Sequence, residues 1–457
     1  MTREKILLSA LSVSASSFLL NAVGAEPARE HDPQLAMIVE QIDSGRIQAT
    51  ILKLASFGTR HTLSDPENPA RGIGAARRWI ESEFRAISEG SGGRLEVRLD
   101  GYRQRPDGRR VTRPVEIVNI VATLRGTQPE SADRIYIISG HYDSICSDPK
   151  DSECDAPGAN DDASGVAAVL EMARVMSPHE FEATLVFMAV AGEEQGLYGS
   201  TYMARQAKAR DWDVQGMITL DIVGSSTGAD GTVDKGHVRV FSEGVPETED
   251  DEARKTRLAT GNENDSAARQ LARWIDESAE LYVPQMDVVL IWRRDRFLRG
   301  GDHTPFAREG FPAVRMTEIN EDYRHQHQNV RVENGVQFGD LPQFVDFEYV
   351  ANVARVNAAT LASLALAPAA PKNAHVMTAK LTTDTTLRWN SNTEPDLAGF
   401  EIVWRETTAP LWQHQHFVGN VTEFTSPLSK DNFIFGVRAV DRNGHRSVVT
   451  YPLPAKE

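Results

Sequence analysis

The sequence predicts an α/β domain, with a mainly parallel mixed sheet flanked by helices, followed by a small all-β sandwich. Between residues 95 and 223, short apolar runs rich in β-branched residues alternate with segments of helical periodicity. This order is typical of a parallel sheet covered by helices. A small-residue, proline-containing stretch follows Leu364, as in a linker between domains. Short strand-like runs recur beyond it, which indicates a β-sandwich.

The elements of the α/β domain follow from the spacing of apolar residues. Residues 31–87 and 196–208 have helical patterns, and residues 162–176 form a helix with an apolar side. The predicted strands are residues 95–99, 118–124, 135–138, 184–191 and 217–223. Ligands of such sheets bind beyond the carboxyl ends of the strands. We therefore expect polar residues that follow these strands to lie together.

The C-terminal part divides into a linker, residues 365–372, and a sandwich, residues 373–457. Strands are expected at residues 375–381, 386–389, 400–405 and 433–440. The segment resembles a fibronectin type III module, because Trp389 and the run that begins at Phe435 stand where such modules have a buried tryptophan and a late core strand. Phe435 takes the place of the usual corner tyrosine. We expect this module to fold separately from the site.

Length, charge and the N-terminus limit the class of protein. A chain of 457 residues favours two domains. The net charge of -16 argues against nucleic acid or an anionic membrane as a partner. Residues 1–25 are predicted to be a signal peptide, with a basic start, an apolar run and the cleavage site Val23-Gly24-Ala25. A membrane anchor is the alternative, but the run is shorter than the roughly 20 residues of a spanning helix. We expect an exported chain, periplasmic or extracellular, without an integral membrane segment after cleavage.

The two cysteines, Cys146 and Cys154, have two interpretations. An exported protein folds in an oxidising compartment, where a disulfide is allowed. A thiolate zinc ligand is the alternative, but the spacing lacks the short gap of structural zinc pairs. We predict a disulfide.

Candidate metal ligands follow the predicted strands. The sequence reads His141-Tyr142-Asp143 after one strand, Asn160-Asp161-Asp162 before a helix and Glu193-Glu194 after another strand. Histidine and carboxylates are the ligands of catalytic zinc. The carboxylates outnumber those that one zinc requires, which indicates two metals and a spare acid as base. Each motif alone also fits a structural role, such as a helix cap for the aspartates.

Together these motifs resemble the zinc aminopeptidases of metallopeptidase family 28, which include bacterial secreted leucyl aminopeptidases. The resemblance extends from about Leu52 to Leu364, through Phe57-Gly58-Thr59-Arg60-His61 and Gly300-Gly301-Asp302-His303. It implies a phosphorylase/hydrolase-like dizinc exopeptidase fold for a catalytic domain of residues 26–364. It also implies a metallo-aminopeptidase that hydrolyses the N-terminal residue from peptides with a free N-terminus.

The resemblance also implies the roles of individual residues. Two Zn²⁺ ions per chain would be held by five ligands, namely His141, Asp161, Glu194, Asp221 and His327. Asp161 would bridge the two ions, and other divalent metals can occupy such ligands. Glu193 would be the general base, and Asp143 would orient the ring of His141.

Two assignments leave alternatives open. His325 competes with His327 as the last ligand, and the family pattern favours His327. Relatives often carry an acid four residues after that histidine, where this chain has Arg331. Asp302 and His303 resemble a motif near the substrate pocket, although a structural role for His303 fits equally well.

Other functions on the same fold also fit the sequence. A glutaminyl cyclase would use one zinc. A carboxypeptidase would need a cation for the substrate carboxylate, and candidates are Arg293, Arg294, Arg296 and Arg299. A catalytically silent peptidase-like binding protein would have lost ligands or the base, and none is lost here.

Overall fold

The computed structural model describes residues 31–455. The predicted signal peptide, residues 1–25, lies outside these residues. The central strands are β1 Leu95–Gln104, β2 Val115–Leu124, β3 Arg134–His141, β4 Thr184–Val190, β5 Asp213–Leu220, β6 His237–Ser242, β7 Asp287–Ile291 and β8 Ala313–Glu318. The helices are α1 Pro33–Glu40, α2 Ser44–Ala55, α3 Gly72–Gly90, α4 Ala163–Met176, α5 Tyr198–Ala209, α6 Asp251–Thr260, α7 Ala267–Tyr282, α8 His303–Arg308 and α9 Phe347–Leu366. The shorter elements near the site are β9 Arg331–Glu333, β10 Val336–Phe338 and the 3₁₀-helix η1 Pro342–Phe344.

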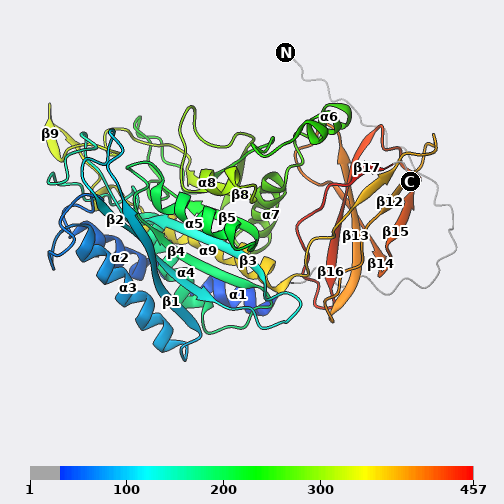
Figure 1. Ribbon diagram of the computed structural model, residues 1–457, viewed down its shortest axis with the longest axis horizontal. Helices are drawn as coiled ribbons and strands as arrows, with labels where there is room; N and C mark the ends of the chain where they lie inside the picture. Colours follow the sequence, from blue (N-terminus) through cyan, green and yellow to red (C-terminus); the bar gives the residue numbers. More distant parts are fainter. Residues whose placement is uncertain (1–30, 456–457) are drawn as a thin grey trace, which may run out of the picture.

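The eight strands form one mixed sheet in the order β1-β2-β4-β3-β5-β8-β6-β7. Four of the seven pairings are parallel, and these include the central strands β4, β3, β5 and β8. The predicted α/β fold with a mainly parallel mixed sheet is confirmed. Helices cover both faces of this sheet (Figure 1).

Two apolar cores lie on the two faces of the sheet. The larger core contains buried residues of α1, α2, α3, α4, α7 and α9, and the smaller contains those of α5 and α8. The central strands β3 and β4 are buried on both faces, which explains their continuous apolar runs. This burial fixes the strand ends, and therefore the loops that carry the site.

The start of α4 is tied to the end of β3 by one carboxylate. Asp162 caps α4 by accepting a hydrogen bond from the backbone N–H of Gly165 at 3.0 Å. The same carboxylate accepts a hydrogen bond from the N–H of His141 at 2.9 Å. Asp162 therefore has the capping role that the sequence left open for the Asp161-Asp162 pair, and Asp161 is available for another role.

The C-terminal segment is a sandwich of two sheets, in the orders β15-β12-β11-β17 and β14-β13-β16. Its strands are β11 His375–Met377, β12 Thr385–Arg388, β13 Leu397–Glu406, β14 His414–Gly419, β15 Glu423–Ser426, β16 Phe433–Asp441 and β17 Leu453–Ala455. Trp389 and Phe435 lie in its core. Strand β17 pairs in parallel with β11, whereas the last strand of an immunoglobulin-type sandwich joins the other sheet. The fibronectin type III assignment stays a prediction.

The sandwich packs directly against α7 (Figure 1). Arg405 contacts both carboxylate oxygens of Asp265, each at 2.9 Å, and neither side chain is more than 1% exposed. Arg438 contacts both carboxylate oxygens of Glu277, at 3.0 and 3.2 Å. The seam therefore contains buried charge pairs, which join the sandwich to the α/β domain. Separate folding of the module stays a prediction. Helix α9 also continues through Leu366, so the first two residues of the predicted linker are helical.

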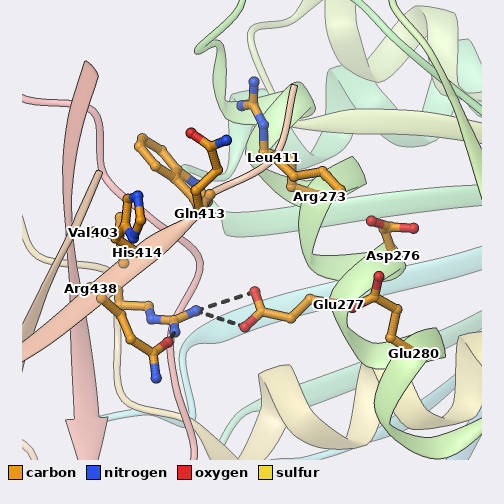
Figure 2. A pocket seen from close by; sticks show the side chains of 11 residues that line it. Arg273, Asp276, Glu277, Glu280, Val403, Leu411, Gln413, His414 and Arg438 are labelled. Atoms are coloured by element: carbon orange, nitrogen blue, oxygen red, sulfur yellow. Dashed lines mark hydrogen bonds and ion pairs between the residues drawn. The ribbon is translucent and has the colours of Figure 1, made fainter. Parts of the chain in front are cut away.

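A cavity of about 300 Å³ lies at this seam. Figure 2 shows Asp276, Glu277 and Glu280 of α7 on one side of it, opposite Arg438 and His414 of the sandwich. Burial, followed by the charges of the neighbouring carboxylates, raises the pKa of Asp276 to about 7. The cavity is part of the interface between the two domains and lies apart from the candidate metal ligands.

Cys146 and Cys154 form a disulfide, so this prediction is confirmed. The bond closes the segment between the His141 and Asp161 motifs. Within residues 31–455, none of the helices combines the length and apolar character needed to span a bilayer.

Candidate metal centre

Three side chains from different elements meet at the carboxyl ends of the central strands. His141 is the last residue of β3, Asp221 follows β5, and Asp161 precedes α4. The Nε2 atom of His141 lies 3.0 Å from Oδ1 of Asp161 and 3.8 Å from Oδ1 of Asp221. All three side chains are buried. Together they form the first candidate site for a cation.

A second group shares Asp161 with the first. The Nε2 atom of His327 lies 3.0 Å from Oδ2 of Asp161 and 3.0 Å from Oε1 of Glu194. Asp161 therefore directs one oxygen to each group, as a carboxylate that bridges two cations does. His327 has a left-handed backbone with φ of 53°.

The donor set fits a divalent metal pair. It has one imidazole and two carboxylates in each group, the mixture that catalytic zinc takes. Although Oε1 of Glu194 is buried 3.0 Å from His327, it has no hydrogen-bond partner of suitable geometry among the described residues. A buried carboxylate oxygen without such a partner is costly, and a cation bound between these groups would satisfy it.

Electrostatics also favour cations here. Burial by itself lowers the pKa of His327, but the carboxylates of Glu194 and Asp161 raise it to about 11. Burial likewise opposes protonation of His141, whose pKa the carboxylates of Asp143, Asp161 and Asp221 raise well above its usual range. The excess of carboxylates therefore attracts positive charge, which bound divalent cations would supply in place of these protons.

The candidate base, Glu193, follows β4 and is half-buried. Burial raises the pKa of its carboxyl well above the usual range, and the charges of Asp221 and Glu194 add to this shift while His141 opposes it. Cations bound nearby would counter this increase. The side chain of Glu193 does not belong to either ligand group, so it is available for proton transfer.

Asp143 fixes the loop that carries Glu193 and Glu194. Its carboxylate accepts hydrogen bonds from the backbone N–H groups of Glu193 at 3.2 Å and Glu194 at 3.1 Å. The hydroxyl of Thr62 also donates to it, at 3.1 Å. The ring of His141 is closer to the backbone oxygen of Asp143, at 3.2 Å, than to its carboxylate, at 3.7 Å. The hydrogen bond to the ring of His141 therefore involves the backbone oxygen of Asp143 and not the carboxylate that was expected to orient it, and the carboxylate positions the loop of the base.

Several neighbours of the ligands did not stand out in the sequence. Arg315 of β8 is completely buried, and its Nη1 lies 2.9 Å from Oδ2 of Asp221. Although burial raises the pKa of Asp221, the charge of Arg315 lowers it to about 2. Gln326 donates to Oδ2 of Asp161 at 3.1 Å, and Asp340 accepts the N–H of Asp161 at 2.7 Å. These contacts hold two of the ligands in place.

Asp302 and His303 lie at the start of α8 and are buried. Burial and the nearby carboxylates of Asp143 and Asp221 raise the pKa of Asp302 to about 7, against the charge of His141. The Nε2 atom of His303 lies 2.9 Å from the backbone oxygen of Arg294. Burial lowers the pKa of His303 to about 4, so it is neutral at pH 7. His303 therefore has a structural contact, whereas Asp302 lies close enough to the ligands to influence their charge.

The two candidate histidines of the last motif have different surroundings. His327 lies with Asp161 and Glu194, whereas the ring of His325 stacks on Phe344 at a centroid distance of 3.7 Å. Arg331, which replaces the acid expected there, lies over the ring of Phe338 at 4.1 Å. The geometry therefore brings His327 to the centre and leaves His325 outside it.

Comparison with known proteins identifies the family. Residues 119–332 match the model of peptidase family M28. A protein of Leptosphaeria maculans named "Probable zinc metalloprotease" is 50% identical over 428 residues, which cover 94% of this chain and 98% of that protein. The chain belongs to peptidase family M28. A second relative in Pyrenophora teres f. teres, with the same name, is 48% identical over 93% of this chain and 88% of that protein.

Solved structures show the same fold as this M28 chain. The LapA aminopeptidase of Legionella pneumophila matches with a TM-score of 0.52 at 19% identity, over 75% of this chain and 77% of that one. LapB of the same organism matches with a TM-score of 0.51 at 21% identity, over 74% of this chain and 77% of that one. At this identity the likeness shows the fold alone, so the bacterial leucyl aminopeptidase type stays a prediction.

Proposed function

We propose that this M28 chain is an exported dizinc aminopeptidase that removes the N-terminal residue of peptides. The observation that carries the proposal is the position of Asp161, which directs one carboxylate oxygen to His141 and the other to His327. The names of the two relatives, both zinc metalloproteases, support zinc as the metal. His141 and Asp221 would hold one ion, Glu194 and His327 the other, and Asp161 both.

Zinc bound at these ligands would polarise the peptide carbonyl and lower the pKa of water. The remaining chemistry belongs to the chain. Glu193 takes a proton from water and passes it to the leaving amine, as a carboxylate that belongs to neither ligand group can. Asp143 keeps Glu193 in position by binding the backbone N–H groups of the loop. Arg315 and Gln326 hold the carboxylates of Asp221 and Asp161, which would bind the ions, in place.

Export is a further part of the proposal. The predicted signal peptide supports it, and so does the disulfide between Cys146 and Cys154, because disulfides persist in oxidising compartments. The carboxypeptidase alternative requires a cation that is free to bind the substrate carboxylate. Three of its four candidate cations are paired with acids, namely Arg294 with Glu243, Arg296 with Glu321 and Arg299 with Glu321.

Substitution of the two adjacent glutamates tests the mechanism. Glu193→Gln keeps the shape of the side chain but cannot accept the proton, so turnover of leucine p-nitroanilide should fall by roughly 10² to 10⁴ with metal still bound. Glu194→Gln should lose metal instead, and added zinc should restore part of its activity. An N-terminally blocked substrate and a chelator are the controls. Normal turnover by metal-loaded Glu193→Gln would refute the assignment of the base, and one bound ion per wild-type chain would favour a cyclase.

A further inference from the structure

Two arginines without ion pairs lie at the rim of the candidate metal centre. They belong to the loop that joins β1 to β2, in which Arg110 and Arg113 are exposed. Within residues 31–455, neither has an acidic partner within ion-pair distance. Each instead donates to a backbone carbonyl, Arg110 to that of Glu194 and Arg113 to that of Leu63.

The two carbonyls belong to segments that meet beside the metal ligands. Glu194 donates its N–H to the carboxylate of Asp143, and Thr62, which precedes Leu63, donates its hydroxyl to the same carboxylate. The segments that anchor Arg110 and Arg113 are therefore joined at Asp143. Arg110 therefore contacts the loop that carries the base and a ligand, and Arg113 contacts the segment of Thr62 that Asp143 joins to that loop.

The arginine loop is held in this position by its own contacts. The hydroxyl of Tyr198 donates to Asp107 at 2.6 Å, and Val111 is completely buried. The carboxylate of Asp107 also accepts the N–H of Val111 at 3.0 Å. These contacts hold the backbone on both sides of Arg110, and they therefore position its guanidinium at the rim.

The mechanism indicates which part of a substrate passes this rim. Glu193 gives its proton to the leaving amine, so the segment after the scissile bond lies beside the Glu193-Glu194 loop. Arg110 contacts that loop at the carbonyl of Glu194. The first residue of the leaving segment would therefore pass the loop that Arg110 contacts, where a charged group on it could meet the guanidinium.

We propose that Arg110, assisted by Arg113, binds a carboxylate on the leaving segment of the substrate. A guanidinium matches a carboxylate with two parallel hydrogen bonds. It would also offset the repulsion of an anionic substrate by a chain of net charge -16. The carboxylate is either the C-terminus of a dipeptide or an acidic side chain after the scissile bond. The inference rests on the proposed peptidase function and defines its substrate class.

Four substrates separate these two sources. Leu-Ala carries a terminal carboxylate that Leu-Ala-amide lacks, and Leu-Asp-amide carries a side-chain carboxylate that Leu-Asn-amide lacks. In the wild type, kcat/KM should be higher for at least one carboxylate member than for its neutral partner. Arg110→Gln should reduce kcat/KM for that member by about tenfold to a hundredfold, mainly through KM, since a charge-assisted hydrogen bond is lost. The neutral members should change less than about twofold.

A matched control and a binding measurement complete the test. Arg125→Gln removes the same charge from an exposed site at the far end of β2 and should not alter the preference. Arg110→Lys should retain part of it, because the charge stays but the fork is lost. In a Glu193→Gln background, titration calorimetry should show weaker binding of the preferred carboxylate substrate after Arg110→Gln.

Different results would refute the binding of a carboxylate and the peptidase activity. Equal kcat/KM within both substrate pairs, or no selective effect of Arg110→Gln in a folded protein of unchanged metal content, would overturn the carboxylate inference and leave the peptidase intact. Absence of turnover of all four dipeptide substrates and of leucine p-nitroanilide by the metal-loaded wild type would overturn the proposed function and the inference with it.

Discussion

The buried charge pair between Arg405 and Asp265 should make the seam sensitive to the loss of one partner. Arg405→Met would leave Asp265 buried without its bidentate partner. Removal of one member of a buried pair costs about 3 to 5 kcal/mol. The Nη1 atom of Arg273 stays 3.5 Å from Asp265 and compensates part of the charge. We therefore expect the free energy of unfolding to fall by about 3 kcal/mol, the lower end of that range.

Urea unfolding followed by circular dichroism would measure this change. The double variant Arg405→Met/Asp265→Asn should lose less than Arg405→Met alone, because it leaves no buried carboxylate and its amide oxygen can still face the guanidinium of Arg273. The control is Arg388→Met in the same sandwich, whose pair with Glu423 is about half exposed and should contribute less than about 1 kcal/mol. A loss below about 1 kcal/mol for Arg405→Met would refute the reasoning.

Metal retention and pH dependence test two other parts of the molecule. Elemental analysis should find about two ions per wild-type chain and fewer than half of them in Asp161→Ala. The control Asp155→Ala, in an exposed loop, should retain both ions. Full retention of metal in Asp161→Ala would contradict a shared ligand. Burial, followed by Asp396 and Asp441, raises the pKa of Glu182 to about 8, so its contribution to stability is present at low pH and is lost as pH rises through 8. Glu182→Gln should therefore raise Tm at pH 9 relative to the wild type and change it little at pH 5, and an equal shift at both pH values would contradict this.

Much of the candidate site follows from the sequence because its residues stand at strand ends. The apolar runs that become β3, β4 and β5 could be recognised in the sequence. His141 ends β3, Asp221 follows β5, and Glu194 lies in the loop after β4. Parallel pairing of these strands then brings the three side chains to one edge. The position of a ligand next to a buried strand is thus a local property that a sequence shows.

The neighbours of the ligands could not be predicted in the same way. Arg315 lies within β8, where a single arginine in a strand gives no indication that it is buried against Asp221. Arg110 belongs to a hairpin loop with several arginines, and only the fold shows that it reaches Glu194. Such contacts join residues far apart in the chain, so they depend on tertiary packing.

The sandwich shows the same limit at the level of domains. The sequence indicated that Trp389 lies in the core of the sandwich, whereas the short strands β14, β15 and β17 were not predicted. The Ala- and Pro-containing linker indicated that the sandwich folds independently. The charges that join the two parts are distributed over distant segments, so the sequence did not show that they meet. Arg438, for example, reads as a polar position in a strand, and its contact with Glu277 is visible only in the structure.

The seam has a consequence for the order in which the protein matures during synthesis. Asp265 and Glu277 leave the ribosome well before Arg405 and Arg438, which neutralise them in the folded protein. Domains generally fold as they emerge from the ribosome, but here two acids of the earlier part also contact arginines that are made later. We expect the peptidase part to become fully resistant to proteolysis only after the last strands are released. Pulse proteolysis of stalled chains that end before and after residue 441 would show whether completion of the chain is the step that produces the stable protein.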